Sequence, residues 1–297
     1  MTAAIPEWRG AIQPVERKPN TIENVVLPLD GSPGSRAGLP VAQGFADLYG
    51  AILHVVHVNQ ETAAPREMAA RLGLHPNDMR GAVVDCYSGD AATMIVRSAK
   101  QLRRSLIVMS THGGSRTQNE PFGSVTEAVL RSQPERIVLV APERGEQSWH
   151  VRQVLLAHDG TPSSDAATAP AAEVAQLAGA EVMAVHVAAR GVEKPEQPGS
   201  LPAPRYIDQP QHEWPSWANE FMERMMAMGA PPSHVRFTLM VTGGQPGSEL
   251  AQVAREKQVD LVVMGMHTDT PHPHPSAMHV VASRSGCPVL LLACRPT

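Results

Sequence analysis

Short apolar segments alternate with longer segments of mixed polarity along most of the chain. The first apolar run, residues 25–29 (VVLPL), is typical of a buried strand, and residues 36–48 carry apolar positions at helical spacing before Gly50. The β-branched run 52–58 (ILHVVHV) is typical of a second strand. Further strands are expected at 82–86, 106–109 and 137–140, and helices at 66–72, 91–103 and 125–132. Strands that alternate with helices in this way predict a parallel sheet with helices on both faces.

The second half of the chain repeats the first. Asp159 follows Asp30 by 129 residues, whereas Met264 follows Met109 by 155. The second copy therefore carries an insertion of 26 residues, and its later loop is shorter by three. A repeat of this length is a duplicated domain, because the repeats of solenoids are far shorter. We expect a flexible tail at 1–20, one domain at 21–145 and a second at 150–297.

The insertion lies within residues 188–216, a proline-rich segment with Trp214 near its end and Trp217 just after it. A connection of this length without secondary structure is uncommon inside a compact domain. We expect a surface loop anchored by the two tryptophans, and a lid over a binding site is the alternative.

One loop stands out, residues 109–124 (MSTHGGSRTQNEPFGS), because it joins an expected strand to an expected helix. Backbone N–H groups of such a loop and of the first helical turn converge on an anion, and the helix dipole favours negative charge. Two residues separate Ser110 from Gly113, and nine separate Gly113 from Gly123, which Ser124 follows at once. The loop therefore predicts a phosphate-binding site.

This spacing resembles the nucleotide-binding signature of the universal stress proteins, G-x2-G-x9-G-[S/T], with Ser110 in place of the first glycine. The resemblance covers residues 23–293 in two copies. It implies an α/β fold with two consecutive five-stranded, mostly parallel sheets and helices on both faces, as in Rossmann-like and adenine nucleotide α-hydrolase proteins. It also implies ATP bound across the carboxyl ends of the strands, where open α/β sheets bind ligands.

The same resemblance assigns roles to individual positions. It implies adenosine contacts at Pro28, Asp30 and Val58. The triphosphate is implied to lie on Ser110, His112, Gly113, Gly114, Gly123, Ser124 and Val125. Glycines let the backbone approach phosphate oxygens closely, and the Ser124 hydroxyl is also a possible Mg²⁺ ligand. The alternatives are that Asp30 only forms the turn before Gly31, and that Gly123 and Ser124 only cap a helix.

Two loop residues leave the prediction open. A positive φ at Ser110 would strain a serine and weaken binding, whereas a negative φ would cost little and add a donor. His112 is expected to orient the loop backbone, with a general base as the alternative. The GxxxxGK[ST] phosphate motif is absent from the sequence.

The corresponding loop of the second copy has lost this pattern. Thr268 replaces the second glycine and Pro275 the third, and each proline of the loop removes an N–H donor. We do not expect a nucleotide there, although Asp159 is kept. The same loop, residues 264–280, also carries His267, His272, His274 and His279. These are either unrelated surface histidines or a Zn²⁺ or Ni²⁺ site.

Composition restricts the possible binding partners and the cellular location of the protein. The chain has 297 residues with a net charge of −4 and a pI near 6.3, which gives no reason to expect nucleic-acid binding. No apolar run approaches the ~20 residues of a membrane span, and the start of the sequence lacks the apolar core of a signal peptide. The cysteines Cys86, Cys287 and Cys294 form no CxxC pair, which suits a reducing interior. We expect a cytoplasmic protein.

The leading hypothesis is a tandem universal stress protein that binds ATP in its N-terminal domain and acts as a stress-response regulator or sensor. At most weak ATP hydrolysis is expected. Residues 137–140 and 289–292 are expected to pair within one chain, and a homodimer of whole chains remains open. The second hypothesis is an enzyme of the adenine nucleotide α-hydrolase group, although DGSPGS at 30–35 matches its SGGxDS loop poorly. The third is a ligand-free interaction module.

Overall fold

The computed structural model describes residues 22–59, 65–75, 81–114, 121–145, 147–188, 201, 213–229, 235–266 and 277–293. The chain divides into two compact units. We call the unit of residues 20–150 with 286–293 the N-terminal unit, and the unit built on residues 151–285 the C-terminal unit.

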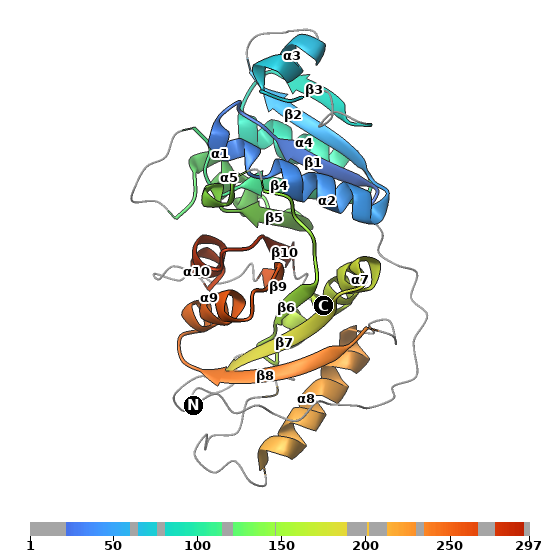
Figure 1. Ribbon diagram of the computed structural model, residues 1–297, viewed down its shortest axis with the longest axis vertical. Helices are drawn as coiled ribbons and strands as arrows, with labels where there is room; N and C mark the ends of the chain where they lie inside the picture. Colours follow the sequence, from blue (N-terminus) through green and yellow to red (C-terminus); the bar gives the residue numbers. More distant parts are fainter. Residues whose placement is uncertain are drawn as a thin grey trace. The chain divides into compact units, whose positions relative to one another are not determined.

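The N-terminal unit contains the strand order β3-β2-β1-β4-β5-β10, parallel except for β10, which runs antiparallel to β5 (Figure 1). Its elements are β1 (Asn24–Pro28), α1 (Pro33–Arg36), α2 (Leu39–Tyr49), β2 (Ile52–Val58), α3 (Pro65–Arg71), β3 (Val83–Tyr87), α4 (Ala91–Gln101), β4 (Ser105–Ser110), α5 (Ser124–Arg131), β5 (Arg136–Val140), the 3₁₀ turn η1 (Pro142–Arg144) and β10 (Val289–Ala293).

The order of the strands reverses between β1 and β4. From β1 the chain passes through α2 to β2, whereas α4 leads from β3 back across β1 to β4. Because such crossovers are right-handed, α2 and α4 cover opposite faces of the sheet, and both helices pack against β1 and β2 (Figure 1). The carboxyl ends of β1 and β4 therefore border a topological switch point, the usual ligand site of an open α/β sheet.

The spacing of apolar residues along α2 explains how the helix packs against the sheet. Its residues Leu39, Val41 and Phe45 are buried against the sheet, and Gly50 ends the helix with φ 60°, a left-handed conformation that glycine adopts without strain. Trp149 packs on Phe45 with ring centroids 4.8 Å apart. The segment that follows η1 is thus anchored on α2 by its tryptophan.

The C-terminal unit repeats this plan with the strand order β9-β6-β7-β8, all parallel. Its elements are β6 (Gln153–Ala157), α6 (Pro162–Asp165), α7 (Thr168–Ala178), β7 (Glu181–Ala188), α8 (Glu213–Gly229), β8 (Phe237–Gly243), α9 (Pro246–Glu256), β9 (Leu261–Met266) and α10 (Ala277–Arg284). The strand order reverses between β6 and β9, which gives this unit a switch point of its own.

The predicted α/β fold with a mostly parallel sheet is confirmed, but the strands do not divide five and five. Strand β10 lies beside β5, so the N-terminal unit has six described strands and the C-terminal unit four. The register pairs Val289 with Leu139 and Leu291 with Ile137. The expected pairing of 137–140 with 289–292 within one chain is therefore present.

The helix α8 was not expected from the sequence, which suggested only a loop up to residue 216. Trp217, Phe221, Met222 and Met225 are buried and repeat at helical spacing, a signal that was available in the sequence. Trp217 is buried as part of α8, and its ring packs on His186 and Phe221. Residues 189–200 and 202–212 lie outside the described part of the chain.

Candidate functional site

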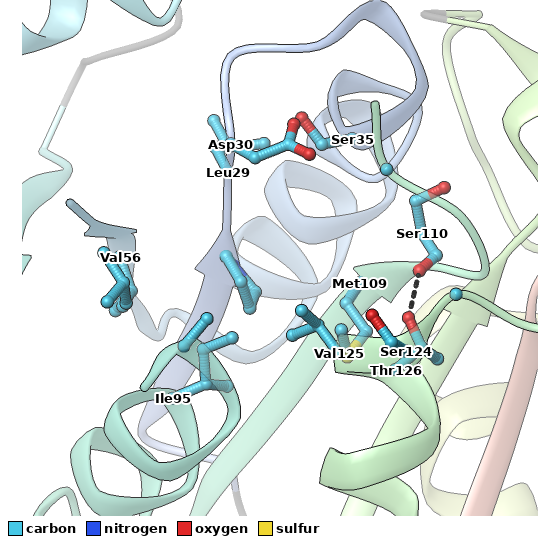
Figure 2. A pocket seen from close by; sticks show the side chains of 15 residues that line it. Leu29, Asp30, Ser35, Val56, Ile95, Met109, Ser110, Ser124, Val125 and Thr126 are labelled. Carbon is cyan, nitrogen blue, oxygen red and sulfur yellow. Dashed lines mark hydrogen bonds between the residues drawn. The ribbon is translucent and has the colours of Figure 1, made fainter. Parts of the chain in front are cut away.

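A pocket of about 120 Å³ lies at the switch point of the N-terminal unit (Figure 2). The ends of β1, β2 and β4 and the first turns of α4 and α5 surround it. It is lined by Pro28, Leu29, Asp30, Ser35, Val56, Val58, Ala91, Ile95, Met109, Ser110, Gly113, Gly123, Ser124, Val125 and Thr126. The structure thus brings together eight of the ten positions that the sequence singled out. The described lining does not include His112 and Gly114.

The Asp30 carboxylate joins the end of β1 to the loop after β4. Its Oδ1 accepts hydrogen bonds from the Ser32 N–H at 2.8 Å and the Ser32 hydroxyl at 2.6 Å. Its Oδ2 accepts one from the Gly114 N–H at 3.0 Å. Asp30 therefore forms the turn before Gly31, as the alternative interpretation expected, and it also fixes the glycine loop. Its expected contact with adenosine stays a prediction.

These contacts keep Asp30 charged. Burial alone would raise the pKa of its carboxyl group, but the hydrogen bonds from Ser32 and from the Gly114 N–H outweigh burial and hold that pKa below its ordinary value of 3.8. At neutral pH the pocket consequently contains a fixed carboxylate, which is a hydrogen-bond acceptor only.

Gly113 is required by its proximity to Asp30. A Cβ atom on Gly113 would overlap Asp30 Oδ2, whereas a Cβ on Gly114 would lie in ordinary contact, 3.4 Å from the Ser32 Cβ. A side chain at residue 113 would therefore displace the carboxylate or the loop. The first of the two adjacent glycines is the one that the site needs.

Ser110 adopts an ordinary backbone conformation, since the described non-glycine residues with positive φ are Arg104, Gln133 and Gln258. Its hydroxyl donates to the His112 carbonyl oxygen at 2.8 Å, and its own carbonyl accepts from the Thr126 hydroxyl at 3.0 Å (Figure 2). The question left open by the sequence is thus answered: serine fits here without strain and stabilises the loop.

The first turn of α5 opens into the pocket. Gly123 is the N-cap residue and supplies no side-chain hydrogen bond to the helix. The Glu127 N–H donates to the Gly123 carbonyl oxygen at 2.9 Å, so the N–H groups of the preceding turn have no intrahelical partner. Ser124 and Val125 are exposed at this end of the helix. The geometry suits a bound anion.

An apolar wall faces these polar groups. Val56 and Val58 come from β2, Ile95 from α4 and Met109 from β4 (Figure 2). Behind the wall, the His57 Nδ1 donates to the Leu29 carbonyl oxygen at 2.7 Å and fixes the end of β1 beside β2. Such a wall suits a flat, weakly polar ring rather than a charged group.

Sequence reasoning missed the pocket residues that belong to no motif: Leu29, Ser35, Val56, Ala91, Ile95, Met109 and Thr126. These residues could have been predicted only from their place in the elements, because each lies at the carboxyl end of a strand or in the first turns of a helix. His112 contacts its neighbour instead, with its Nδ1 3.3 Å from the Thr111 hydroxyl. The Gly114 N–H donates to Asp30.

The C-terminal unit has a pocket at its own switch point, with a volume of about 270 Å³. Its described lining consists of Ala157, His158, Asp159, Ser164, Val185, Val187, Pro246, Leu250, Met264, Gly265 and Ala277. Of the expected histidine cluster, His267, His272 and His274 lie outside the described residues, and His279 lies in α10. Within the described part of the chain, no three His, Cys, Asp or Glu side chains are grouped to hold a metal ion.

Known proteins with the same architecture were found by comparison. The model of the universal stress protein family matches residues 79–141 and 150–293. A universal stress protein from Archaeoglobus fulgidus matches at 17% identity and a TM-score of 0.63, covering 92% of this chain and 98% of that one. A functionally unknown protein from Pseudomonas aeruginosa PAO1 matches at 14% identity and a TM-score of 0.66, covering 93% and 94%. These structural likenesses concern the fold. No curated protein matches the sequence significantly.

Proposed function

The chain belongs to the universal stress protein family as a tandem, two-domain member, and on this premise we propose that its N-terminal unit binds ATP and that the protein acts as a stress-response regulator or sensor. One observation carries the proposal. An open helix N-terminus, a glycine loop and a fixed carboxylate meet an apolar wall in a single pocket at the switch point.

The polar side of the pocket fits a polyphosphate. The N–H groups of the first turn of α5 and the dipole of that helix favour an anion. Gly113 and Gly123 carry no Cβ that would hold a phosphate away from the backbone. The Ser124 hydroxyl lies at the same helix end and suits Mg²⁺, which takes its remaining oxygens from phosphate and water.

The other side fits adenosine. The wall of Val56, Val58 and Ile95 suits the flat base, and the Asp30 carboxylate suits ribose hydroxyl groups because it only accepts hydrogen bonds. The base and the triphosphate would then occupy opposite sides of one pocket, with the sugar between them at Asp30.

Calorimetric titration of the full chain with ATP, with and without Mg²⁺, tests the proposal. We expect one ATP per chain. In Gly123→Ala the new Cβ lies 3.6 Å from the His112 Cα and the Thr111 carbonyl oxygen, so the fold accepts it. We expect the melting temperature to stay unchanged while ATP affinity falls by about tenfold or more. An absence of heat with the intact chain would refute ATP binding.

A matched serine pair tests the Mg²⁺ ligand. Ser124→Ala removes the hydroxyl at the pocket end of α5, and Ser132→Ala removes one at the far end, where it donates to the Val129 carbonyl oxygen. We expect only Ser124→Ala to reduce the gain in ATP affinity that Mg²⁺ gives. Equal effects of the two changes would remove Ser124 from the proposal.

Two measurements, pyrophosphate release and the same ATP titration, separate the other hypotheses. Rapid release of pyrophosphate from bound ATP would favour an enzyme of the α-hydrolase group, and an absence of nucleotide binding would favour an interaction module. We further infer a cytoplasmic location, because the three cysteines of the sequence are an odd number and form no CxxC pair. None of the described helices is long and apolar enough to cross a membrane.

A further inference from the structure

The pocket of the C-terminal unit corresponds residue by residue to the pocket of the N-terminal unit. Each of its described lining residues is the repeat counterpart of a residue that lines the other pocket. Asp159, Ser164, Val185, Val187 and Met264 are identical to their counterparts Asp30, Ser35, Val56, Val58 and Met109. The two pockets therefore share an apolar wall and a carboxylate.

The turn that carries the carboxylate is also repeated. Asp159 Oδ1 accepts hydrogen bonds from the Thr161 N–H at 2.9 Å and the Thr161 hydroxyl at 2.6 Å, as Asp30 Oδ1 does from Ser32. His186 Nδ1 donates to the His158 carbonyl oxygen at 3.0 Å, as His57 does to Leu29. These contacts of the half suited to a base and a sugar are thus repeated. One contact differs, because the Ser164 hydroxyl donates to Asp159 Oδ1, whereas its counterpart Ser35 donates to the Ser32 carbonyl oxygen.

The phosphate half is not kept. In the sequence, Thr268 and Pro275 add side chains where the N-terminal unit has Gly113 and Gly123, and Pro275 also lacks an N–H. Neither lysine nor arginine is found among the described lining residues to replace those donors. A polyanion would therefore meet the Asp159 carboxylate with fewer backbone donors than the sequence of the first loop provides.

The substitution of Leu29 by His158 adds no positive charge. His158 Nδ1 accepts a hydrogen bond from the Gly160 N–H at 3.1 Å, so the proton of the ring lies on Nε2. That Nε2 donates to Asp165 Oδ1 at 2.9 Å, and both side chains are buried. The ring is neutral, and Phe221 of α8 packs against it with centroids 5.1 Å apart.

The C-terminal pocket is the roomier of the two. Ala157 replaces Pro28, and the cavity grows from about 120 to about 270 Å³. This volume approaches the lower end of about 300–1,000 Å³ that is typical for small-molecule sites. Apolar walls with one carboxylate acceptor select an uncharged ring compound that carries hydroxyl or amino donors.

We propose that the C-terminal pocket binds a nucleoside, a base with its sugar and without phosphate. This inference rests on the proposed nucleotide site, because the shared half of the two pockets identifies the ligand class. The chain then carries two sites for a base with its sugar, and the two differ in their tolerance of phosphate. Val187 and the Asp159 carboxylate are the contacts that define the second site.

Matched tryptophan variants separate the two pockets. Val58→Trp fills the N-terminal pocket and Val187→Trp its counterpart, and both valines are partly exposed, so a larger ring has room to turn outward. The probes are radiolabelled adenosine and radiolabelled ATP in equilibrium dialysis against the full chain. Ala277→Phe, at the partly exposed start of α10, replaces Val187→Trp if that variant does not melt cooperatively.

We expect Val58→Trp to retain one adenosine site per chain, and we expect ATP to bind that site at least about tenfold more weakly than adenosine. The retained site should disappear in the double variant. The inference is overturned if Val58→Trp binds no adenosine, or if the retained site takes ATP as tightly as adenosine. If the unaltered chain takes up no ATP but Val58→Trp still binds adenosine, the proposed ATP function fails and the nucleoside site stands.

Discussion

Asp30 Oδ2 accepts a hydrogen bond at 3.0 Å from the backbone N–H of Gly114, which lies 84 residues further along the chain. This contact joins the loops that follow β1 and β4, the two strands that border the switch point. Because Asp30 Oδ1 is held by Ser32 at the same time, the carboxylate fixes the glycine loop against the start of α1. The conformation of the pocket thus depends on this one side chain.

The adjacent glycines provide a first prediction. Gly113→Ala places a Cβ against Asp30 Oδ2 and forces the carboxylate or the loop to move, whereas Gly114→Ala makes only an ordinary contact at 3.4 Å. We expect Gly113→Ala to weaken ATP binding by about tenfold or more and Gly114→Ala to leave it nearly unchanged. Calorimetry on both variants checks this, and equal losses would show that the overlap with Asp30 is not the cause.

A second prediction concerns Ser110, where the family signature has glycine. Ser110→Gly removes the hydrogen bond to the His112 carbonyl oxygen and adds chain entropy to the unfolded state. We expect a loss of about 1–2 kcal/mol in the free energy of unfolding, with ATP affinity changed by less than about threefold. Urea unfolding and titration measure the two effects. A large gain in affinity would show that serine impairs the site.

A third prediction concerns acid and the C-terminal unit. Burial lowers the pKa of His186 below its ordinary value of 6.5, against the opposing effect of its hydrogen bond to the His158 carbonyl. The folded state therefore keeps His186 neutral while the unfolded chain takes up a proton below about pH 6.5. Stability is full above that pH and falls below it, by at most about 1.4 kcal/mol per pH unit.

The variant His186→Asn keeps a donor for the His158 carbonyl oxygen but does not titrate. Urea unfolding of the C-terminal unit at pH 7.5 and 5.5 should show a smaller loss for this variant than for the unaltered chain. An identical pH dependence in the two proteins would remove His186 as the cause. The ring contacts with Trp217 and Phe221, at 5.1 and 5.3 Å, are also lost, so only the difference between the two pH values is compared.

Much of the fold could be predicted from the sequence because local patterns decided it. The run 52–58 forms β2 with the expected bounds, and Gly50 ends α2. The pairing of β5 with β10 was also expected, but the place of β10 in the N-terminal unit depends on contacts that only the complete structure shows. The helix α8 was not predicted because its start lies in the proline-rich segment 188–216, which is typical of a loop. The buried positions Trp217, Phe221 and Met225 nevertheless repeat at helical spacing.

The candidate site was predictable where a motif marked it. The spacing of Gly113, Gly123 and Ser124 led to residues that do line one pocket. The apolar wall was not predictable, since Ile95 reads as an ordinary core residue of α4 until the fold places it at the carboxyl ends of the strands. The contact between Asp30 and Gly114 depends on the orientation of a side chain, and no sequence pattern specifies that.

A fourth prediction tests the anchor on α2. A Cβ on Gly44 would lie 2.7 Å from the Trp149 ring, and Trp149 is 5% exposed. Gly44→Ala should therefore destabilise the N-terminal unit by about 1–3 kcal/mol, the usual cost of overpacking, although alanine favours a helix. The exposed Asp47→Ala in the same helix should change stability by no more than about 0.5 kcal/mol. Stabilisation by Gly44→Ala in urea unfolding would show that Trp149 moves aside without cost.

The last prediction follows from the position of β10, which pairs with β5 although it follows α10 of the other unit in sequence. A chain ending at Gly286 lacks β10 and leaves the apolar strand β5 (RIVLV) as an open sheet edge. Such edges pair with other chains, so we expect self-association in analytical ultracentrifugation and faster amide exchange in β5. A chain ending at Ala293 keeps β10 and serves as the matched control. If the shorter chain behaves like this control in both measurements, β10 does not protect the edge of the N-terminal sheet.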